Sequence, residues 1–298
     1  MSIRQITIIG TGLIGGSFGL AVKKARFSGR IVGCDRAAVL ERAREKGAID
    51  EGQTNPADSI RGSQVVLLAT PVGGIIDLIE RLGPALPART LLTDAGSTKA
   101  RVVARAEETF GKNAASRFLA GHPMAGKEQS GVEFADAELF QGAAWFFTPV
   151  RGQDIYSGLS GEFLEWVEKT GARVAGMDVE EHDHLCAWIS HLPQMISTAL
   201  AASLVDEFGE YAPLLEAGGR ALREMTRIAS SPYSMWRDIA ITNKENIARG
   251  LMKLEQRLAH IRENLETREL AAEFERAHHL RKPRPKVEKL KGKRSVGH

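Results

Sequence analysis

Three polar side chains that could contact a ligand, Thr70, Ser97 and His122, each follow a short apolar run typical of a buried strand. Ligands of open α/β sheets bind beyond the carboxyl ends of the strands, so we expect all three at one edge of a sheet. A neutral imidazole at His122 could accept the proton of a substrate hydroxyl while hydride leaves the same carbon. Ser97 could orient that imidazole or a nicotinamide.

Ser97 and His122 also have a purely structural interpretation. His122 could satisfy backbone groups of its loop, and Ser97 could cap a helix. Pro123 favours extended backbone at His122, which suits either role. Their position alone leaves both interpretations open.

Residues 10–15 have the spacing G-x-G-x-x-G and lie between a β-branched run and a predicted helix. In a dinucleotide-binding turn the first glycine permits the tight turn, the second lets the backbone approach a pyrophosphate, and the third packs helix on strand. The N–H groups at the start of the helix would face the anion. The predicted cofactor contacts are Gly10, Gly12, Leu13, Ile14 and Gly15, with Thr70 at a neighbouring strand end.

Asp35 stands at the end of the second β-branched run, where its carboxylate would accept hydrogen bonds from an adenosine ribose. The same carboxylate would repel a 2′-phosphate by about 4 kcal/mol, for unit charges about 4 Å apart at an effective dielectric constant near 20. We therefore expect NAD as the cofactor. Arg36 could neutralise a phosphate and keeps NADP open as the alternative.

The elements that position these residues alternate between apolar runs and helical periodicity up to about residue 148. This alternation predicts an α/β fold with a doubly wound, mostly parallel Rossmann-type sheet. After Pro149 nearly every segment has helical period, apart from a possible strand at 173–177. We place the dinucleotide-binding domain at 1–150 and an all-helical substrate and dimerisation domain at 151–280. Its long helices need a partner for their apolar faces, so a homodimer is expected.

The charge distribution makes nucleic-acid binding by the folded part of the chain unexpected and leaves contact with nucleic acid or an anionic surface open only for the C-terminal tail. The segment 281–298 holds eight Lys or Arg and one Glu, and we expect a disordered basic tail there. Because the formal net charge is +3, the other 280 residues sum to −4 and offer no basic surface. No segment has about 18 uninterrupted apolar residues, so we expect no membrane contact. Two cysteines suit a reducing, cytoplasmic location.

Three histidines on one predicted helix, His182, His184 and His191, raise the possibility of a metal site. His184 and His191 share a face but lie roughly 10.5 Å apart along the axis, too far for one ion. His182 and His191 face opposite ways, so no metal is expected. Pro193 predicts a kink that could form a cavity wall, which makes His191 a better candidate for substrate contact.

Seven segments resemble, in the same order, the signatures of the prephenate and arogenate dehydrogenase family of tyrosine biosynthesis. They are Gly10–Gly15, Asp94–Lys99, Gly121–Gly126, Ser130–Glu133, Ser190–Pro193, Thr226–Ala229 and Met235–Asp238. The resemblance covers about residues 5–265. It implies an NAD(P)-binding domain, a helical dimerisation domain, and an active site in the cleft between them.

The resemblance implies oxidative decarboxylation of prephenate to 4-hydroxyphenylpyruvate, or of arogenate to tyrosine. His122 would be the catalytic histidine, and Ser97 the serine that orients it. His191, Arg227 and Glu128 would contact the substrate, Arg227 through a carboxylate and Glu128 from a position after the His122 loop that varies in the family. From the residues alone, Arg227 would instead form a surface ion pair with its helical neighbour Glu224.

Two other functions compete with this one. A Rossmann oxidoreductase of the β-hydroxyacid type would normally need a lysine base on the long helix, where this chain has His191. A non-catalytic NAD-binding regulator would keep the glycine turn and Asp35 alone. The joint presence of Ser97, His122, His191 and Arg227 argues against the regulator.

Overall fold

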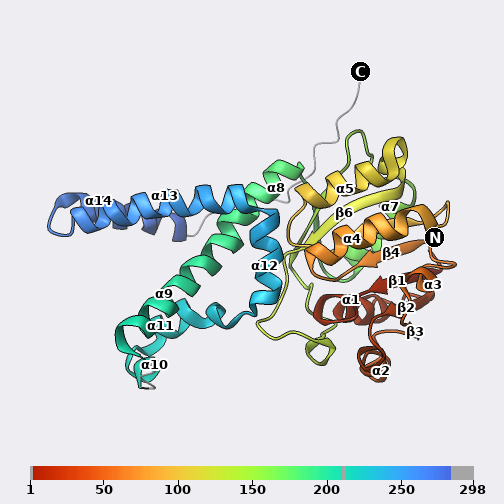
Figure 1. Ribbon diagram of the computed structural model, residues 1–298, viewed down its shortest axis with the longest axis horizontal. Coiled ribbons are helices and arrows are strands. Elements are labelled where there is room, and N and C mark those ends of the chain that lie inside the picture. Colours follow the sequence, from red (N-terminus) through yellow and green to blue (C-terminus); the bar gives the residue numbers. More distant parts are fainter. Residues whose placement is uncertain (1–2, 210–212, 283–298) are drawn as a thin grey trace.

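The N-terminal part of the molecule is built on one sheet. The computed structural model describes residues 3–209 and 213–282, and within these ranges the sheet has eight strands in the order β3-β2-β1-β4-β5-β6-β7-β8 (Figure 1). The strands are β1 Gln5–Ile9, β2 Arg30–Cys34, β3 Glu51–Gln53, β4 Val65–Leu68, β5 Leu91–Asp94, β6 Phe118–Pro123, β7 Ala144–Thr148 and β8 Arg173–Gly176. Strands β1 to β6 are parallel, and β7 runs antiparallel to β6. The predicted doubly wound, mostly parallel sheet is confirmed.

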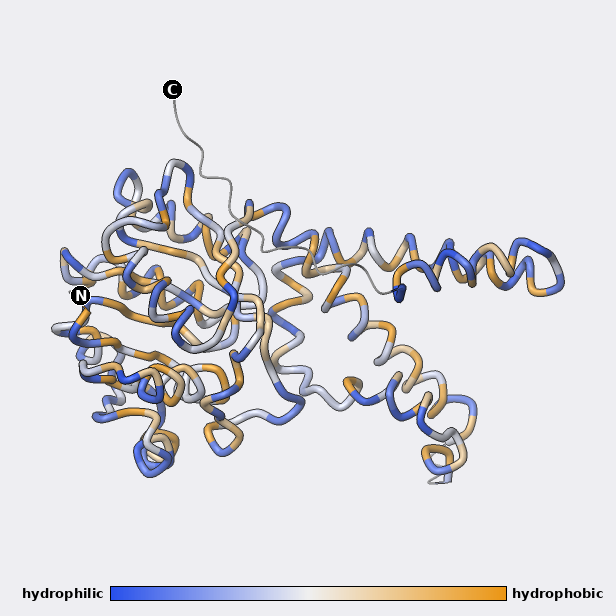
Figure 2. Tube along the Cα trace, turned by 180° about the vertical axis from the view of Figure 1, so that it is seen from behind, coloured by the Kyte–Doolittle hydropathy of each residue, from blue (hydrophilic) through white to orange (hydrophobic). Residues whose placement is uncertain are grey.

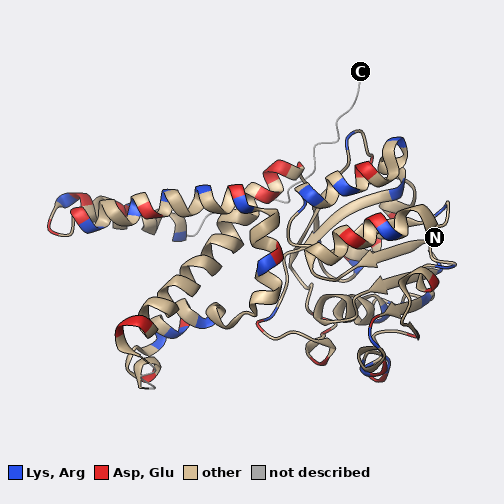
Figure 3. Ribbon diagram, in the orientation of Figure 1, with Lys and Arg blue, Asp and Glu red and all other residues tan. Residues whose placement is uncertain are grey.

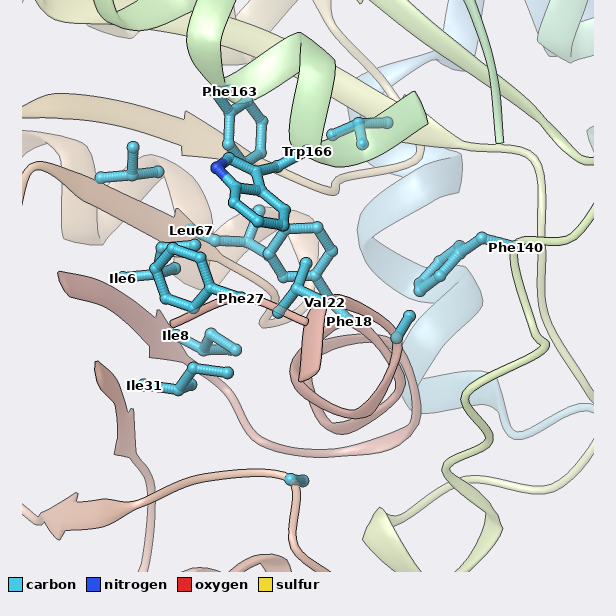
Figure 4. Close-up of a cluster of buried hydrophobic side chains, with 14 of the residues drawn as sticks. Ile6, Ile8, Phe18, Val22, Phe27, Ile31, Leu67, Phe140, Phe163 and Trp166 are labelled. Atoms are coloured by element: carbon cyan, nitrogen blue, oxygen red, sulfur yellow. The ribbon is translucent and has the colours of Figure 1, made fainter. Parts of the chain in front are cut away.

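Helices cover both faces of this sheet because its central strands are apolar on both sides. The helices of this part are α1 Leu13–Lys24, α2 Ala37–Glu45, α3 Pro56–Ser59, α4 Val72–Leu82, α5 Ala100–Phe110, α6 Ala114–Arg117 and α7 Gly158–Lys169. Along β4, Val65 and Leu67 enter one buried cluster, and Val66 and Leu68 enter the other. Figure 4 shows side chains of the first cluster contributed by β1, β2, β4, α1 and α7.

The sheet-containing unit extends further along the chain than the sequence suggests. Helix α7 buries Phe163 and Val167 in the first cluster, and β8 pairs in parallel with β7. The boundary expected at residue 150 therefore falls inside this unit, which ends at Gly176. The helical period after Pro149 belongs to a crossover helix of the sheet, and the expected strand at 173–177 is its last strand.

The remaining described residues are helical. The helices are α8 Val179–Cys186, α9 Leu192–Phe208, α10 Leu214–Ala217, α11 Gly219–Thr226, α12 Tyr233–Thr242, α13 Lys244–Glu263 and α14 Arg268–Arg281. A π-helical segment, Ala187–His191, separates α8 from α9, and Pro193 lies in the first turn of α9. The irregularity predicted from Pro193 is thus present. Helices α12 and α13 are separated at Asn243.

Helices α13 and α14 form an arm that projects away from the sheet (Figure 1). Helix α14 has no buried residue, and α13 buries only Ile247 and Gly250. Charged residues of both signs recur along the arm in Figure 3, and apolar residues recur between them in Figure 2. Large apolar side chains left exposed on the long helices are Val205, Phe208, Met252, Leu258, Phe274 and Leu280.

Two expectations concern the membrane and the tail. No helix in the described part of the chain combines the length and hydropathy needed to cross a bilayer. The expected basic tail at 281–298 lies, after its first two residues, outside the described residues.

Candidate active site

The glycine turn between β1 and α1 forms an open helix N-terminus. Gly10 has φ +93°, and a Cβ there would lie 2.6 Å from the carbonyl oxygen of Ala69. A Cβ at Gly15 would lie 2.0 Å from the carbonyl oxygen of Gly10, whereas one at Gly12 would meet nothing within 4 Å. No side chain caps α1, and its first turn holds no acidic residue. The N–H groups of Leu13, Ile14 and Gly15, which precede the first helical hydrogen bond of α1, are therefore available to an anion.

Asp35 is held beside this turn by two backbone hydrogen bonds. The N–H of Thr11 donates to Oδ2 over 2.9 Å, and the N–H of Arg36 donates to Oδ1 over 2.8 Å. The carboxylate follows β2 directly, as predicted for a ribose contact. Arg36 is exposed at the start of α2.

Two adjoining cavities lie beyond the carboxyl ends of the strands. One, of about 320 Å³, follows the glycine turn and is lined by Gly12 and Thr70 among others. The other, of about 470 Å³, lies between the sheet edge and the helical domain and is lined by His122 and Arg227 among others. Both cavities are lined by Leu13, Ile14, Ser97 and Glu128. The glycine turn and the histidine thus open into one continuous crevice.

His122 is the fifth residue of β6 and is 8% exposed. Its Nδ1 lies 2.9 Å from Nε2 of His182, so its own Nε2 is the ring nitrogen left for a ligand. Burial, followed by electrostatic interactions with His182, Lys99 and His191, holds the pKa of His122 well below its usual range. The imidazole is therefore neutral near pH 7, as a base for a hydroxyl proton must be.

The residue that touches His122 is not the one the sequence suggests. Ser97 lines both cavities, but no hydrogen bond joins it to His122 among the described residues. The ring nitrogen Nδ1 of His122 contacts His182 of α8, which is fully buried. The ring of His182 also meets Phe146 of β7 edge to face, at a centroid distance of 5.9 Å.

Asp183, which the sequence analysis did not single out, connects α8 to the start of α5. Its Oδ1 accepts hydrogen bonds from the N–H of Lys99 over 2.7 Å and from Nδ1 of His182 over 2.8 Å. Its Oδ2 accepts from the N–H of Ala100 over 2.9 Å. Burial alone would raise the pKa of Asp183, but the hydrogen bonds from His182 and the two backbone groups outweigh it and lower the pKa. The carboxylate is therefore ionised.

A buried ion pair fixes the strand end that carries His122. Lys99 and Asp94 are fully buried and in contact through Nζ and Oδ2. Nζ of Lys99 also donates to the carbonyl oxygen of Gly121 over 2.8 Å, and the N–H of Gly121 donates to Oδ1 of Asp94 over 3.1 Å. This pair holds the backbone of β6 immediately before the histidine.

His191 lies behind the wall of the larger cavity and does not line it. Nδ1 of His191 is 3.2 Å from Nδ2 of Asn243, and its Nε2 is buried without a partner among the described residues. Its ring meets that of Trp236, which does line the cavity, at a centroid distance of 5.9 Å. Burial lowers the pKa of His191 to about 4. The structure thus places His191 one side chain away from the predicted substrate contact.

Arg227 lies on the cavity wall in close contact with Glu128, through Nη1 and Oε1. The partner suggested by helical spacing, Glu224, pairs instead with Arg220 over 2.7 Å. The structure thus brings Arg227 and Glu128 together on the cavity wall, and the surface pair of Arg227 with Glu224 is not formed.

His182, His184 and His191, which were considered for a metal, do not form one cluster, but His182 lies close to two other possible metal ligands. Ligand atoms of His122, His182 and Cys186 lie within 4.8 Å of one another. The 2.9 Å between the two imidazole nitrogens is a hydrogen-bond length, and burial raises the pKa of Cys186 to about 12. These groups are accounted for as a hydrogen-bonded cluster.

The sequence matches two family models that follow one another along the chain. The nucleotide-binding domain of prephenate dehydrogenase matches residues 18–175, and its dimerisation domain matches residues 178–279. The chain belongs to the prephenate dehydrogenase family. The change from one match to the other falls at the end of β8, where the sheet-containing unit also ends.

Individual prephenate dehydrogenases are similar over most of this chain. Those of Lactococcus lactis subsp. cremoris and Bacillus subtilis are 34% and 36% identical over 82% and 81% of it. The matches span 66% and 65% of those two proteins, slightly less than two thirds. The crystal structure of the Aquifex aeolicus prephenate dehydrogenase with hydroxyphenyl propionate and NAD+ superposes with a TM-score of 0.82 at 32% identity. That match covers 94% of this chain and 96% of the other.

Replacing Lys99 with Met should destabilise the fold, because the charge of Asp94 would stay buried without its partner. We expect a loss of about 3 to 5 kcal/mol in the free energy of unfolding, measured by urea denaturation. As a control, Lys23→Met removes an exposed pair with Asp50 and should cost less than about 1 kcal/mol. Equal losses in the two variants would contradict the role given to the buried pair.

Proposed function

We propose that this chain catalyses the NAD-dependent oxidative decarboxylation of prephenate to 4-hydroxyphenylpyruvate. The observation that carries the proposal is the neutral imidazole of His122, which opens into a cavity continuous with the glycine turn. Arogenate, which carries an amino group in place of the side-chain keto group, is the alternative substrate.

The glycine turn fits the dinucleotide. The uncapped N-terminus of α1 can bind a pyrophosphate, and Asp35, fixed by the N–H of Thr11, can accept from ribose hydroxyls. Gly12 leaves open space where any side chain would stand against the phosphates. Bound NAD+ would supply the hydride acceptor for oxidation of the alcohol carbon.

The chain's own residues would bind the substrate and accept its proton. The hydroxyl O–H bond breaks as Nε2 of His122 takes the proton, and the carbon loses hydride to become a carbonyl. Loss of carbon dioxide from the opposite ring carbon leaves its bonding electrons to the ring, which becomes aromatic as the carbonyl oxygen takes the proton back from His122 and becomes the phenol hydroxyl. Arg227 would exchange Glu128 for a substrate carboxylate and so fix the ring over the cofactor site.

The direct test is NADH or NADPH formation by the purified chain, with prephenate and arogenate each offered with NAD+ and NADP+. We expect turnover with prephenate and NAD+. His122→Asn should lower kcat by about 100-fold or more while NAD+ affinity stays unchanged. His184→Asn, which changes an exposed histidine on α8, should behave as wild type. Absence of turnover in all four combinations would refute the activity, and full turnover by His122→Asn would refute its role.

Arg227→Ala should weaken substrate binding more than turnover. Loss of a charged hydrogen bond of about 1.5 to 3 kcal/mol corresponds to a rise in KM of roughly 10- to 100-fold. Arg30→Ala removes a comparable exposed arginine, paired with Glu51 over 2.9 Å at the amino end of β2, and should leave KM unchanged. An unaltered KM in Arg227→Ala would return this arginine to a purely surface role.

We infer that the chain forms a homodimer through its helical domain. The arm of α13 and α14 buries almost none of its own residues, and its exposed apolar side chains need a cover. The family model that matches this part describes a dimerisation domain.

Charges placed on the arm should therefore separate the protomers. Wild-type protein should have twice the chain mass of 32.4 kDa by light scattering, and Leu258→Glu combined with Phe274→Glu should shift it to one chain mass. Tyr156→Glu, on an exposed residue of the sheet-containing unit, should leave the dimer intact. A dimer that survives the double substitution would place the interface elsewhere.

A further inference from the structure

Three side chains form a hydrogen-bonded chain that leads from the cavity into the protein. His122 of β6 contacts His182 of α8 over 2.9 Å, and His182 contacts Asp183 over 2.8 Å. His182 is completely buried, with 0% of its surface accessible, and Asp183 is 2% exposed. The order of groups from the cavity inward is therefore imidazole, imidazole, carboxylate.

The carboxylate at the inner end fixes the direction of the first hydrogen bond. Asp183 is surrounded by donors, namely the N–H groups of Lys99 and Ala100 and the ring of His182. These donors keep its pKa low, and an ionised carboxylate can only accept. Nδ1 of His182 must therefore carry a hydrogen.

The direction of the second hydrogen bond follows from the first. When His182 is neutral, its one ring hydrogen lies on Nδ1 and its Nε2 has a lone pair, so Nδ1 of His122 donates to that lone pair. The thiol of Cys186, whose raised pKa keeps it protonated, lies 3.5 Å from the same Nε2, but Nε2 has one lone pair and its 2.9 Å contact with His122 is the shorter. His122 is then left with an unprotonated Nε2 on the cavity side.

We propose that His182 and Asp183 are positioning residues that hold His122 in the tautomer with hydrogen on Nδ1 and a lone pair on Nε2. This inference rests on the proposed function, in which Nε2 accepts the substrate's hydroxyl proton. The O–H bond breaks and an N–H bond forms at Nε2. The resulting imidazolium donates through Nδ1 to His182, whose far side faces the negative charge of Asp183.

Two substitutions of His182 separate this role from simple packing. An Asn amide reaches the place of Nδ1 and can still donate to Asp183, but it leaves no acceptor where Nε2 stood. A Gln amide reaches the place of Nε2 and can present its oxygen to Nδ1 of His122. The two variants therefore differ in the one contact that sets the tautomer.

We expect His182→Asn to lower kcat by about 100-fold, with KM and the Kd for NAD+ changed by less than about threefold. His182→Gln should recover about tenfold of that loss, the scale of one hydrogen bond. Thr98→Val, which breaks the 2.8 Å contact between Thr98 and Thr242 at the same domain junction, should keep wild-type kcat. Equal losses in the Asn and Gln variants, or a rise in KM that accounts for them, would overturn the positioning role.

The pH profile gives a second readout. The groups facing His122 are His182 and Cys186 from α8, Lys99 before α5 and His191 from the π-helical segment. An imidazole in the wrong tautomer cannot accept a proton at any pH, so the loss in His182→Asn should persist as pH is raised. Recovery of wild-type kcat at high pH by His182→Asn would show that the substitution changed the protonation of His122 and not its tautomer, which would contradict the positioning role.

A third measurement does not need activity. Nitrogen NMR of the histidine-labelled wild-type chain, assigned with His122→Asn, should show His122 protonated on Nδ1 and unprotonated on Nε2. The opposite tautomer would overturn the proposal even in an active enzyme, whereas an inactive wild type would defeat the proposed function alone. Zinc bound to His122, His182 and Cys186 in the purified chain would also overturn it, since a metal and a hydrogen cannot share Nδ1.

Discussion

The carboxylate of Asp183 holds the active site and the domain junction together. It is buried, and burying a charge is unfavourable unless hydrogen bonds replace its water. The N–H groups of Lys99 and Ala100 supply two of them at the start of α5, where the helix dipole also favours a negative charge. The third comes from His182, and the backbone carbonyl of Asp183 accepts a further bond from Asn243. The cavity walls on both sides therefore depend on one charged group.

The sequence predicts best what depends on local spacing or on the geometry common to all parallel sheets. The glycine turn is set by close approaches that only glycine permits, so its pattern is visible in the chain. Ser97 follows β5 and His122 lies near the end of β6, where the carboxyl ends of parallel strands meet at one edge, and both line the predicted crevice. The short strand Glu51–Gln53 contains no apolar side chain and gives no such signal.

Contacts between distant segments could not be predicted in the same way. His182 lies 60 residues from His122, and a helical wheel shows only that it faces away from His191. Arg227 has a suitable partner three residues away, yet the fold offers it Glu128, from a loop that spacing cannot place. The boundary at residue 150 was misplaced because a crossover helix and a helix of the second domain have the same periodicity.

Because of the π-helical segment Ala187–His191, the structure of this region depends more on the number of residues between α8 and α9 than on their identity. It inserts a wider turn between the helix that carries His182 and the helix that begins at Leu192. Removing one residue there would restore regular winding and rotate everything downstream by about 100°. The ring of His191, which now meets that of Trp236, would then point elsewhere. Natural variants of this chain should therefore carry substitutions, but no insertions or deletions, in the segment that joins α8 to α9.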